Sequence, residues 1–124
     1  MAQTYVAVVD DEASVRVALG RLLRLADCEV AAFASGEEFL NSITGHVPDC
    51  VLLDIHMPGL SGLQVMARMT SARAGLAHLP VVVITASDNP EIARIALDAG
   101  ASRVLHKPFS NQELLEAIGG AVRV

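Results

Sequence analysis

Polar residues able to take part in chemistry stand at the ends of four apolar runs in this sequence of 124 residues. They are Asp10, Asp11, Asp54, Thr85 and Lys107. Carboxylates that cluster repel one another, so such a group takes up protons or recruits a cation. Oxygen ligands select a hard cation, and Mg²⁺ binds through one or two carboxylates while leaving room for a phosphoryl group. If the fold brings these residues together, they form a candidate site for Mg²⁺ and a phosphoryl group.

A carboxylate in such a site can be the nucleophile. Asp54 could attack phosphorus and become an acyl phosphate. The cation and Lys107 would then neutralise the three equatorial oxygens of the transferring group. The Thr85 hydroxyl is able to hydrogen-bond one of these oxygens.

Each of these residues, taken alone, also fits a purely structural role. Asp10 and Asp11 suit a helix cap and a first turn, and Asp54 before Pro-Gly suits an Asx turn. Thr85 suits a capped strand end, and Lys107 suits a solvated position before proline. Their shared placement favours the chemical interpretation, because the separate structural roles do not explain why all of them follow apolar runs.

Apolar runs indicate five β-strands, at Tyr5–Val9, Glu29–Phe33, Cys50–Leu53, Val81–Ile84 and Arg103–His106. The segments between them carry apolar residues at helical spacing, so strands and helices alternate. This alternation predicts an α/β fold, a doubly wound parallel sheet with helices on both faces. Ligands of such sheets bind beyond the carboxyl ends of the strands. The predicted topology therefore places the polar residues on one rim.

Helix boundaries are marked by residues with terminal preferences. Ser35 and Ser110 each precede a glutamate by three residues, which is the capping-box pattern. Pro90 suits a first helical turn. Gly119 and Gly120 predict that the last helix frays early.

The composition is that of a globular chain, and we expect residues 1–124 to form a single domain. Hydrophobic residues make up 52% and charged residues 19%, which excludes a disordered chain. A net charge of −5 and 3% aromatic residues exclude a direct nucleic-acid binder. The sequence has no apolar run near membrane-spanning length and no signal peptide pattern, so we expect a cytoplasmic protein without a membrane segment. Cys28 and Cys50 lack metal-ligand spacing and are expected to be reduced thiols.

Four motifs of the chain resemble those of one protein family. They are VVDDE at 8–12, LLDIHMPGLSG at 52–62, VVVITAS at 81–87 and LHKPF at 105–109. In this order and spacing they resemble the receiver domain of two-component response regulators, over nearly the whole chain. The resemblance implies a flavodoxin-like (βα)5 fold with strand order 2-1-3-4-5, which sets the first and third strands side by side.

The resemblance also implies a role for each acid. Asp54 is the expected phosphoacceptor of a switch that catalyses its own phosphorylation and dephosphorylation and is not an enzyme with a separate substrate. The expected ligands of Mg²⁺ are Asp10, Asp11, Asp54 and the main-chain carbonyl of His56. The His56 side chain flanks the phosphoryl group, where it is expected to tune hydrolysis.

Further roles follow from the resemblance at the last two strands. Thr85 is the expected switch hydroxyl, and Lys107 is the expected lysine that pairs with the phosphate. The peptide bond before Pro108 is expected to be cis. Ala86 matches a small residue that leaves the acceptor open to a donor, and Ser87 stands at a second position that tunes hydrolysis.

One position departs from the family pattern. Members often carry Tyr or Phe three residues before the lysine, and here that residue is Val104. Valine has no ring to rotate inward and is stiff at its first torsion. Strand alternation puts His106 on the same side as Val104, where it either supplies the missing ring or is an ordinary edge-strand side chain.

The resemblance implies a histidine kinase or a histidine phosphotransfer protein as the donor. An effector or a second copy would bind through the fourth helix, the fifth strand and the fifth helix. The chain either stands alone or is the receiver of a larger transcriptional regulator or hybrid kinase.

Two other classes remain as alternatives at this point. An aspartate-nucleophile phosphatase needs a second acid two residues after the nucleophile, where this chain has His56. A nucleotide-binding domain of the same architecture needs glycine in its first turn, where this chain has Asp10, Asp11 and Glu12.

Overall fold

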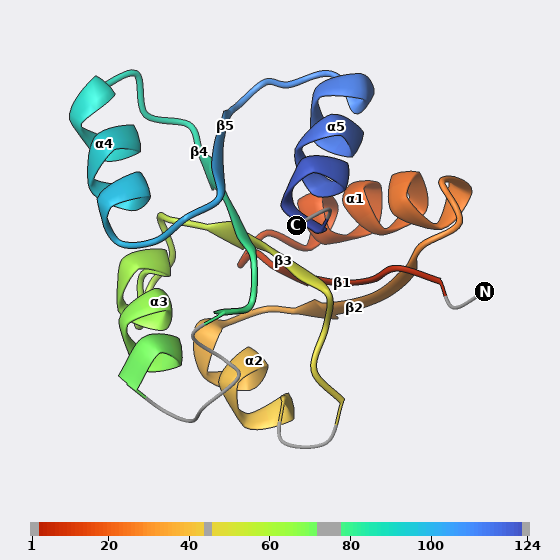
Figure 1. Cartoon of the computed structure of the whole chain (residues 1–124), viewed down its shortest axis with the longest axis horizontal. Coiled ribbons are helices and arrows are strands. Elements are labelled where there is room, and N and C mark those ends of the chain that lie inside the picture. Colours follow the sequence, from red (N-terminus) through yellow and green to blue (C-terminus); the bar gives the residue numbers. More distant parts are fainter. Residues whose placement is uncertain (1–2, 44–45, 72–77, 123–124) are drawn as a thin grey trace.

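The computed structural model describes residues 3–43, 46–71 and 78–122. Five parallel strands form one sheet in the order β2-β1-β3-β4-β5. The strands are β1 (Tyr5–Val9), β2 (Glu29–Phe33), β3 (Cys50–Asp54), β4 (Val81–Thr85) and β5 (Arg103–His106). The helices are α1 (Ala13–Leu25), α2 (Gly36–Ser42), α3 (Gly62–Ser71), α4 (Pro90–Asp98) and α5 (Asn111–Val122). Strands and helices alternate along the chain (Figure 1), which confirms the predicted fold and strand order.

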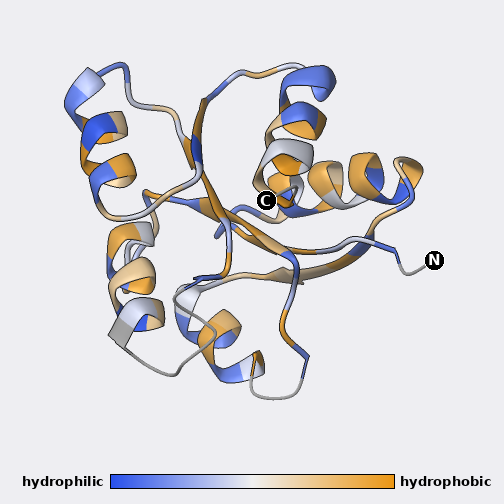
Figure 2. Ribbon diagram, viewed as in Figure 1, coloured by the Kyte–Doolittle hydropathy of each residue, from blue (hydrophilic) through white to orange (hydrophobic). Residues whose placement is uncertain are grey.

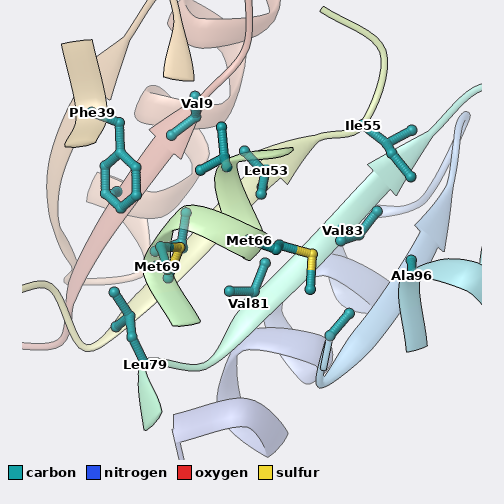
Figure 3. Packing of buried hydrophobic residues seen from close by; sticks show 14 of the residues in the cluster. Val9, Phe39, Leu53, Ile55, Met66, Met69, Leu79, Val81, Val83 and Ala96 are labelled. Atoms are coloured by element: carbon teal, nitrogen blue, oxygen red, sulfur yellow. The ribbon is translucent and has the colours of Figure 1, made fainter. Parts of the chain in front are cut away.

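Helices cover both faces of the sheet. α1 and α5 lie on one face, and α2, α3 and α4 lie on the other (Figure 1). Successive strand residues point to opposite faces, so the core divides into two clusters. The cluster beneath α2, α3 and α4 contains Val9, Leu53 and Val83 (Figure 3). The cluster beneath α1 and α5 contains the neighbouring residues Leu52 and Ile84.

The burial of the central strands accounts for the apolar runs in the sequence. β3 and β4 are buried along their whole length, as expected where helices cover a parallel sheet from both sides. Apolar residues concentrate on the strands and on one side of the helices (Figure 2). In the described ranges, no helix has both the length and the apolar character needed to cross a bilayer.

Two strands are one residue longer than the sequence predicted. β3 includes Asp54 and β4 includes Thr85, because the ladder continues through both residues. Asp54 pairs with Ile84, and Thr85 pairs with His106. The polar side chains are therefore fixed by the sheet itself and not by the loops that follow.

The predicted helix starts are confirmed by hydrogen bonds. Ser35 Oγ accepts the Glu38 N–H at 3.1 Å. Ser110 Oγ accepts the Glu113 N–H at 3.0 Å, and the Glu113 carboxylate accepts the Ser110 N–H at 2.9 Å. Pro90 opens α4. These caps satisfy backbone donors that the first turn of a helix leaves free.

The expectation that the last helix frays early, at Gly119 and Gly120, is wrong. α5 continues through Gly119 and Gly120 to Val122. Tertiary packing overrides the low helix propensity of glycine here. Ile118 and Ala121, on either side of the two glycines, are buried in the cluster beneath α1 and α5.

The two cysteines are packing residues. Cys28 and Cys50 are both free thiols, as predicted. Burial raises the pKa of Cys50 to about 12, so this side chain stays a protonated and unreactive thiol at neutral pH.

Candidate functional site

The sheet register places the acid that follows β1 beside the acid that ends β3. Val9 pairs with Leu53, so Asp10 and Asp54 follow at the same level on adjacent strands. The two aspartates are only 1% and 5% exposed. Asp11 is exposed beside them, and each of the three carboxylates offers an oxygen within 4.8 Å of the other two. Three carboxylates at this spacing suit a hard cation such as Mg²⁺.

Asp10 contributes a buried oxygen that lacks a hydrogen bond. Its Oδ1 accepts the Glu12 N–H at 2.9 Å, but no group among the described residues donates to its Oδ2. Lys107 Nζ lies 3.6 Å from this oxygen, which is longer than a hydrogen bond. A buried carboxylate oxygen without a partner is costly. A cation bound here would satisfy it, so the residues present fit the expected metal.

Asp54 is held in an electrostatic environment that disfavours its charge. Burial raises the pKa of its carboxyl group, and the nearby Asp10 and Asp11 carboxylates raise this pKa further. The His56 backbone N–H, which donates to Asp54 Oδ1 at 3.1 Å, and the Lys107 ammonium act in the opposite direction. The pKa of Asp54 remains raised above its ordinary value. A bound cation would favour the carboxylate, which is the nucleophilic form.

The Thr85 hydroxyl is buried and already hydrogen-bonded. Thr85 is 3% exposed, and its Oγ1 accepts the Ser87 N–H at 3.0 Å. His56 Nε2 lies 3.2 Å from the same hydroxyl oxygen. Thr85 is therefore linked to two of the positions that the sequence singled out as modulators.

Lys107 is fixed to the neighbouring strand by its backbone. Its N–H donates to the Thr85 carbonyl at 2.8 Å. The Lys107–Pro108 peptide bond is cis, as the family resemblance implied. Because the ammonium group approaches Asp10, residues from the ends of β1, β3, β4 and β5 lie along one rim.

The remaining predicted positions surround this rim. Ala86 is exposed directly after β4. Val104 is half-buried and packs against the cluster beneath α2, α3 and α4. His106 is about half exposed, and its Nε2 lies 3.0 Å from Asp88 Oδ1 in the loop between β4 and α4. His106 is thus in contact with the loop that carries Ser87.

Two residues that contact the site were missed by sequence reasoning. Arg16 Nη1 donates to the Asp10 carbonyl at 2.8 Å. Gly62 packs so closely on the end of β3 that an added Cβ would lie 2.7 Å from the Asp54 carbonyl oxygen. Gly62 is the last residue of the motif at 52–62, but the motif alone does not indicate this close approach. No spacing rule identifies Arg16 from the sequence.

A family model and several known proteins match nearly the whole chain in sequence. The family model of the response regulator receiver domain matches residues 6–119. Nodulation protein W of Bradyrhizobium diazoefficiens is 40% identical over 116 residues, which are 94% of this chain and 50% of that protein. The transcriptional regulatory protein PrrA of Mycobacterium tuberculosis is 40% identical over 118 residues, which are 95% of this chain and 49% of that protein. The chain thus spans about half the length of these curated relatives.

Comparison of the fold with solved structures also identifies a response regulator as a similar protein. The crystal structure of a protein from Chloroflexus aurantiacus, assigned as a response regulator, superposes with a TM-score of 0.93 at 31% identity. The match covers 99% of this chain and 100% of that one. A receiver match sets aside the phosphatase and nucleotide-binding alternatives. By sequence and by fold, the chain belongs to the family of response regulator receiver domains.

Proposed function

We propose that this receiver domain accepts a phosphoryl group on Asp54 from a histidine kinase or a histidine phosphotransfer protein, with Mg²⁺ as cofactor. One observation carries this proposal. The buried Asp54 carboxylate shares a rim with two further acids, with one oxygen of each within 4.8 Å of the others, and Lys107 Nζ lies 3.6 Å from Oδ2 of one of them, Asp10. This rim combines a nucleophile with ligands for a hard cation and a fixed positive charge.

Transfer begins when an Asp54 carboxylate oxygen attacks the phosphorus of a phosphohistidine. An O–P bond forms while the N–P bond breaks, and the electron pair of the broken bond stays on the imidazole nitrogen. Lys107 stabilises the negative charge on the phosphoryl oxygens. The residues that would hold Mg²⁺ are Asp10, Asp11, Asp54 and His56 through its main-chain carbonyl. Bound there, Mg²⁺ supplies further positive charge for the same oxygens.

The same rim supports hydrolysis of the acyl phosphate and its readout. Attack of water on phosphorus forms a new O–P bond and breaks the bond to the Asp54 oxygen, which releases inorganic phosphate and restores the Asp54 carboxylate. Thr85 is the proposed switch hydroxyl, and the exposed Ala86 leaves the acceptor open to the donor. His56 and Ser87 both contact the Thr85 hydroxyl, which supports a role for them in tuning the lifetime of the phosphoryl group.

The proposed surface for an effector or a second copy is formed by α4, β5 and α5. α4 exposes Ile95 and Leu97, two apolar residues that a partner would cover. Val104, in β5, has no aromatic ring that could rotate inward as in the usual switch. We therefore propose that His106 is the residue on this surface that changes position when Asp54 is phosphorylated. A net charge of −5 argues against direct contact of this domain with nucleic acid.

The setting is that of a cytoplasmic signalling protein, in which residues 1–124 act as one domain. The transcriptional regulatory relative PrrA is about twice as long as this chain. The site is compatible with a receiver inside a longer regulator and with a receiver that relays phosphate by itself. The proposed chemistry needs only the rim described above.

The test is phosphorylation by a small donor. Acetyl phosphate with Mg²⁺ should label the parent protein once, and Asp54→Asn should abolish the label, because the amide keeps the shape but is not a nucleophile. Asp98→Asn, at an exposed position in α4, is the matched control and should keep the label. A label that persists in Asp54→Asn, or that resists hydroxylamine, would move the acceptor to another residue.

A further inference from the structure

His56 connects the acceptor with the switch hydroxyl. Its backbone N–H donates to Asp54 Oδ1 at 3.1 Å, while its ring Nε2 lies 3.2 Å from Thr85 Oγ1. The imidazole is exposed, so packing does not impose this ring position. The contact with the buried Thr85 hydroxyl is thus a specific feature of the side chain.

The hydrogen bonds of Thr85 limit what its hydroxyl can do. Oγ1 already accepts the Ser87 N–H, and a hydroxyl has one proton to donate. A phosphoryl group on Asp54 offers oxygen acceptors, so Thr85 must direct that one proton toward it. When His56 Nε2 carries no proton, the Thr85 proton is already donated to the ring. When Nε2 is protonated, it donates to Oγ1 and holds the oxygen in place.

We propose that the His56 imidazole is a positioning residue that restrains Thr85 in the unphosphorylated protein. Recruitment of Thr85 by the acyl phosphate then requires the His56–Thr85 contact to break. His56 thereby lowers the apparent affinity of the protein for an acyl-phosphate mimic, because the contact has to break before Thr85 can turn to the phosphoryl group. This inference rests on the proposed function, because it needs Asp54 to be the acceptor.

The test is a double-mutant cycle with beryllofluoride and Mg²⁺, a mimic of the acyl phosphate. Binding is measured for the parent, His56→Ala, Thr85→Val and the double variant. Loss of a single hydrogen bond corresponds to a change of about two- to tenfold in an equilibrium constant. We expect His56→Ala to bind the mimic tighter by about this factor in the parent background and to have no effect in the Thr85→Val background.

Two further variants separate positioning from simple access to the site. His56→Gln can place a side-chain amide group near the position of Nε2 and should restore much of the parent affinity. His46→Ala removes a histidine whose ring contacts Tyr5 at the opposite end of β1, and it should leave the affinity unchanged. In the free protein, His56→Ala should move the NMR signals of the Thr85 methyl group and the Ser87 amide toward their beryllofluoride-bound positions.

The outcomes distinguish this inference from the function on which it rests. An equal gain from His56→Ala in both backgrounds would mean that the ring only shields the site, and weaker binding would mean that it supports the bound state. Either result overturns the inference and leaves the acceptor role of Asp54 intact. Failure of the parent to bind beryllofluoride with Mg²⁺ would refute the proposed function and the inference together.

Discussion

Gly62→Ala should disturb the end of β3, which carries Asp54. A Cβ at Gly62 would lie 2.7 Å from the Asp54 carbonyl oxygen and 2.7 Å from the Ile55 Cα, whereas ordinary contacts begin at 3.4 Å. Both atoms belong to the backbone, so α3 and the end of β3 must separate by about 0.7 Å. Overpacking of this kind costs about 1–3 kcal/mol. Gly62 is the first residue of α3, where the helix propensity of alanine counts for less than in a helix interior, so a net loss within the same range of about 1–3 kcal/mol remains.

The measurement is urea unfolding with and without Mg²⁺. Gly62→Ala should lower the free energy of unfolding. It should also weaken the binding of Mg²⁺, because the displaced backbone carries the Asp54 carboxylate. Gly119→Ala is the matched control, since a Cβ at this helical position meets nothing within 4 Å. It should raise the free energy of unfolding by up to about 1 kcal/mol without any change in Mg²⁺ affinity.

The two glycines therefore predict effects of opposite sign from the same substitution. If Gly62→Ala were as stable as Gly119→Ala and bound Mg²⁺ like the parent, the close packing at Asp54 would not constrain the site. A loss of stability with normal Mg²⁺ affinity would show that α3 moves while β3 stays in place.

Three other outcomes are expected. Without metal, Asp54→Asn should have a higher free energy of unfolding than the parent at neutral pH. The pKa of Asp54 in the folded protein is raised above 3.8, so its negative charge destabilises the fold at any pH above that raised pKa. The difference in free energy of unfolding between the variant and the parent should therefore shrink as the pH falls toward 3.8. A difference in urea unfolding that stays constant with pH would contradict this assignment. Mg²⁺ at about 100 times its dissociation constant should raise the free energy of unfolding by about 2.7 kcal/mol, and Asp11→Asn should require more Mg²⁺; melting curves that millimolar Mg²⁺ does not move would count against the metal site. His106→Ala and Asp88→Asn should each change stability by less than about 0.5 kcal/mol, because both side chains are exposed, yet should shift the same amide signals of the β4–α4 loop in NMR spectra; unrelated shift patterns would mean that their contact does not position this loop.

The fold was predictable from the sequence because burial on both faces leaves a strong pattern. β3 and β4 are buried at every position, so their sequences read as continuous apolar runs between helical segments. The capping box at Ser110 is a local feature, and its hydrogen bonds follow from four consecutive residues. The end of α5 was mispredicted because Gly119 and Gly120 are held in a helix by contacts with distant residues, which propensity does not describe.

The acids, the threonine and the lysine of the site were predictable because each lies at the end of a strand or within two residues after it. Parallel strands bring such ends to one rim whatever the loops do. The contact between His56 and Thr85, 29 residues apart in sequence, depends on where the loop after β3 lies relative to the end of β4. The close approach of Gly62 to Asp54 depends on the position of a whole helix. Neither leaves a periodic trace in the sequence.

The sheet fixes the spacing of the rim residues, whereas residues on the outer surfaces of the helices can change without affecting that spacing. Adjacent strands lie about 4.8 Å apart, so the sheet itself sets the spacing between the Asp10 and Asp54 side chains. Insertions at the far ends of the strands, or exchanges on the outer surfaces of α4 and α5, leave that spacing unchanged. After a gene duplication, one copy can therefore diverge toward a new partner while the reaction stays the same. Insulation between parallel signalling pathways in one cell would then depend on surface residues and not on the rim.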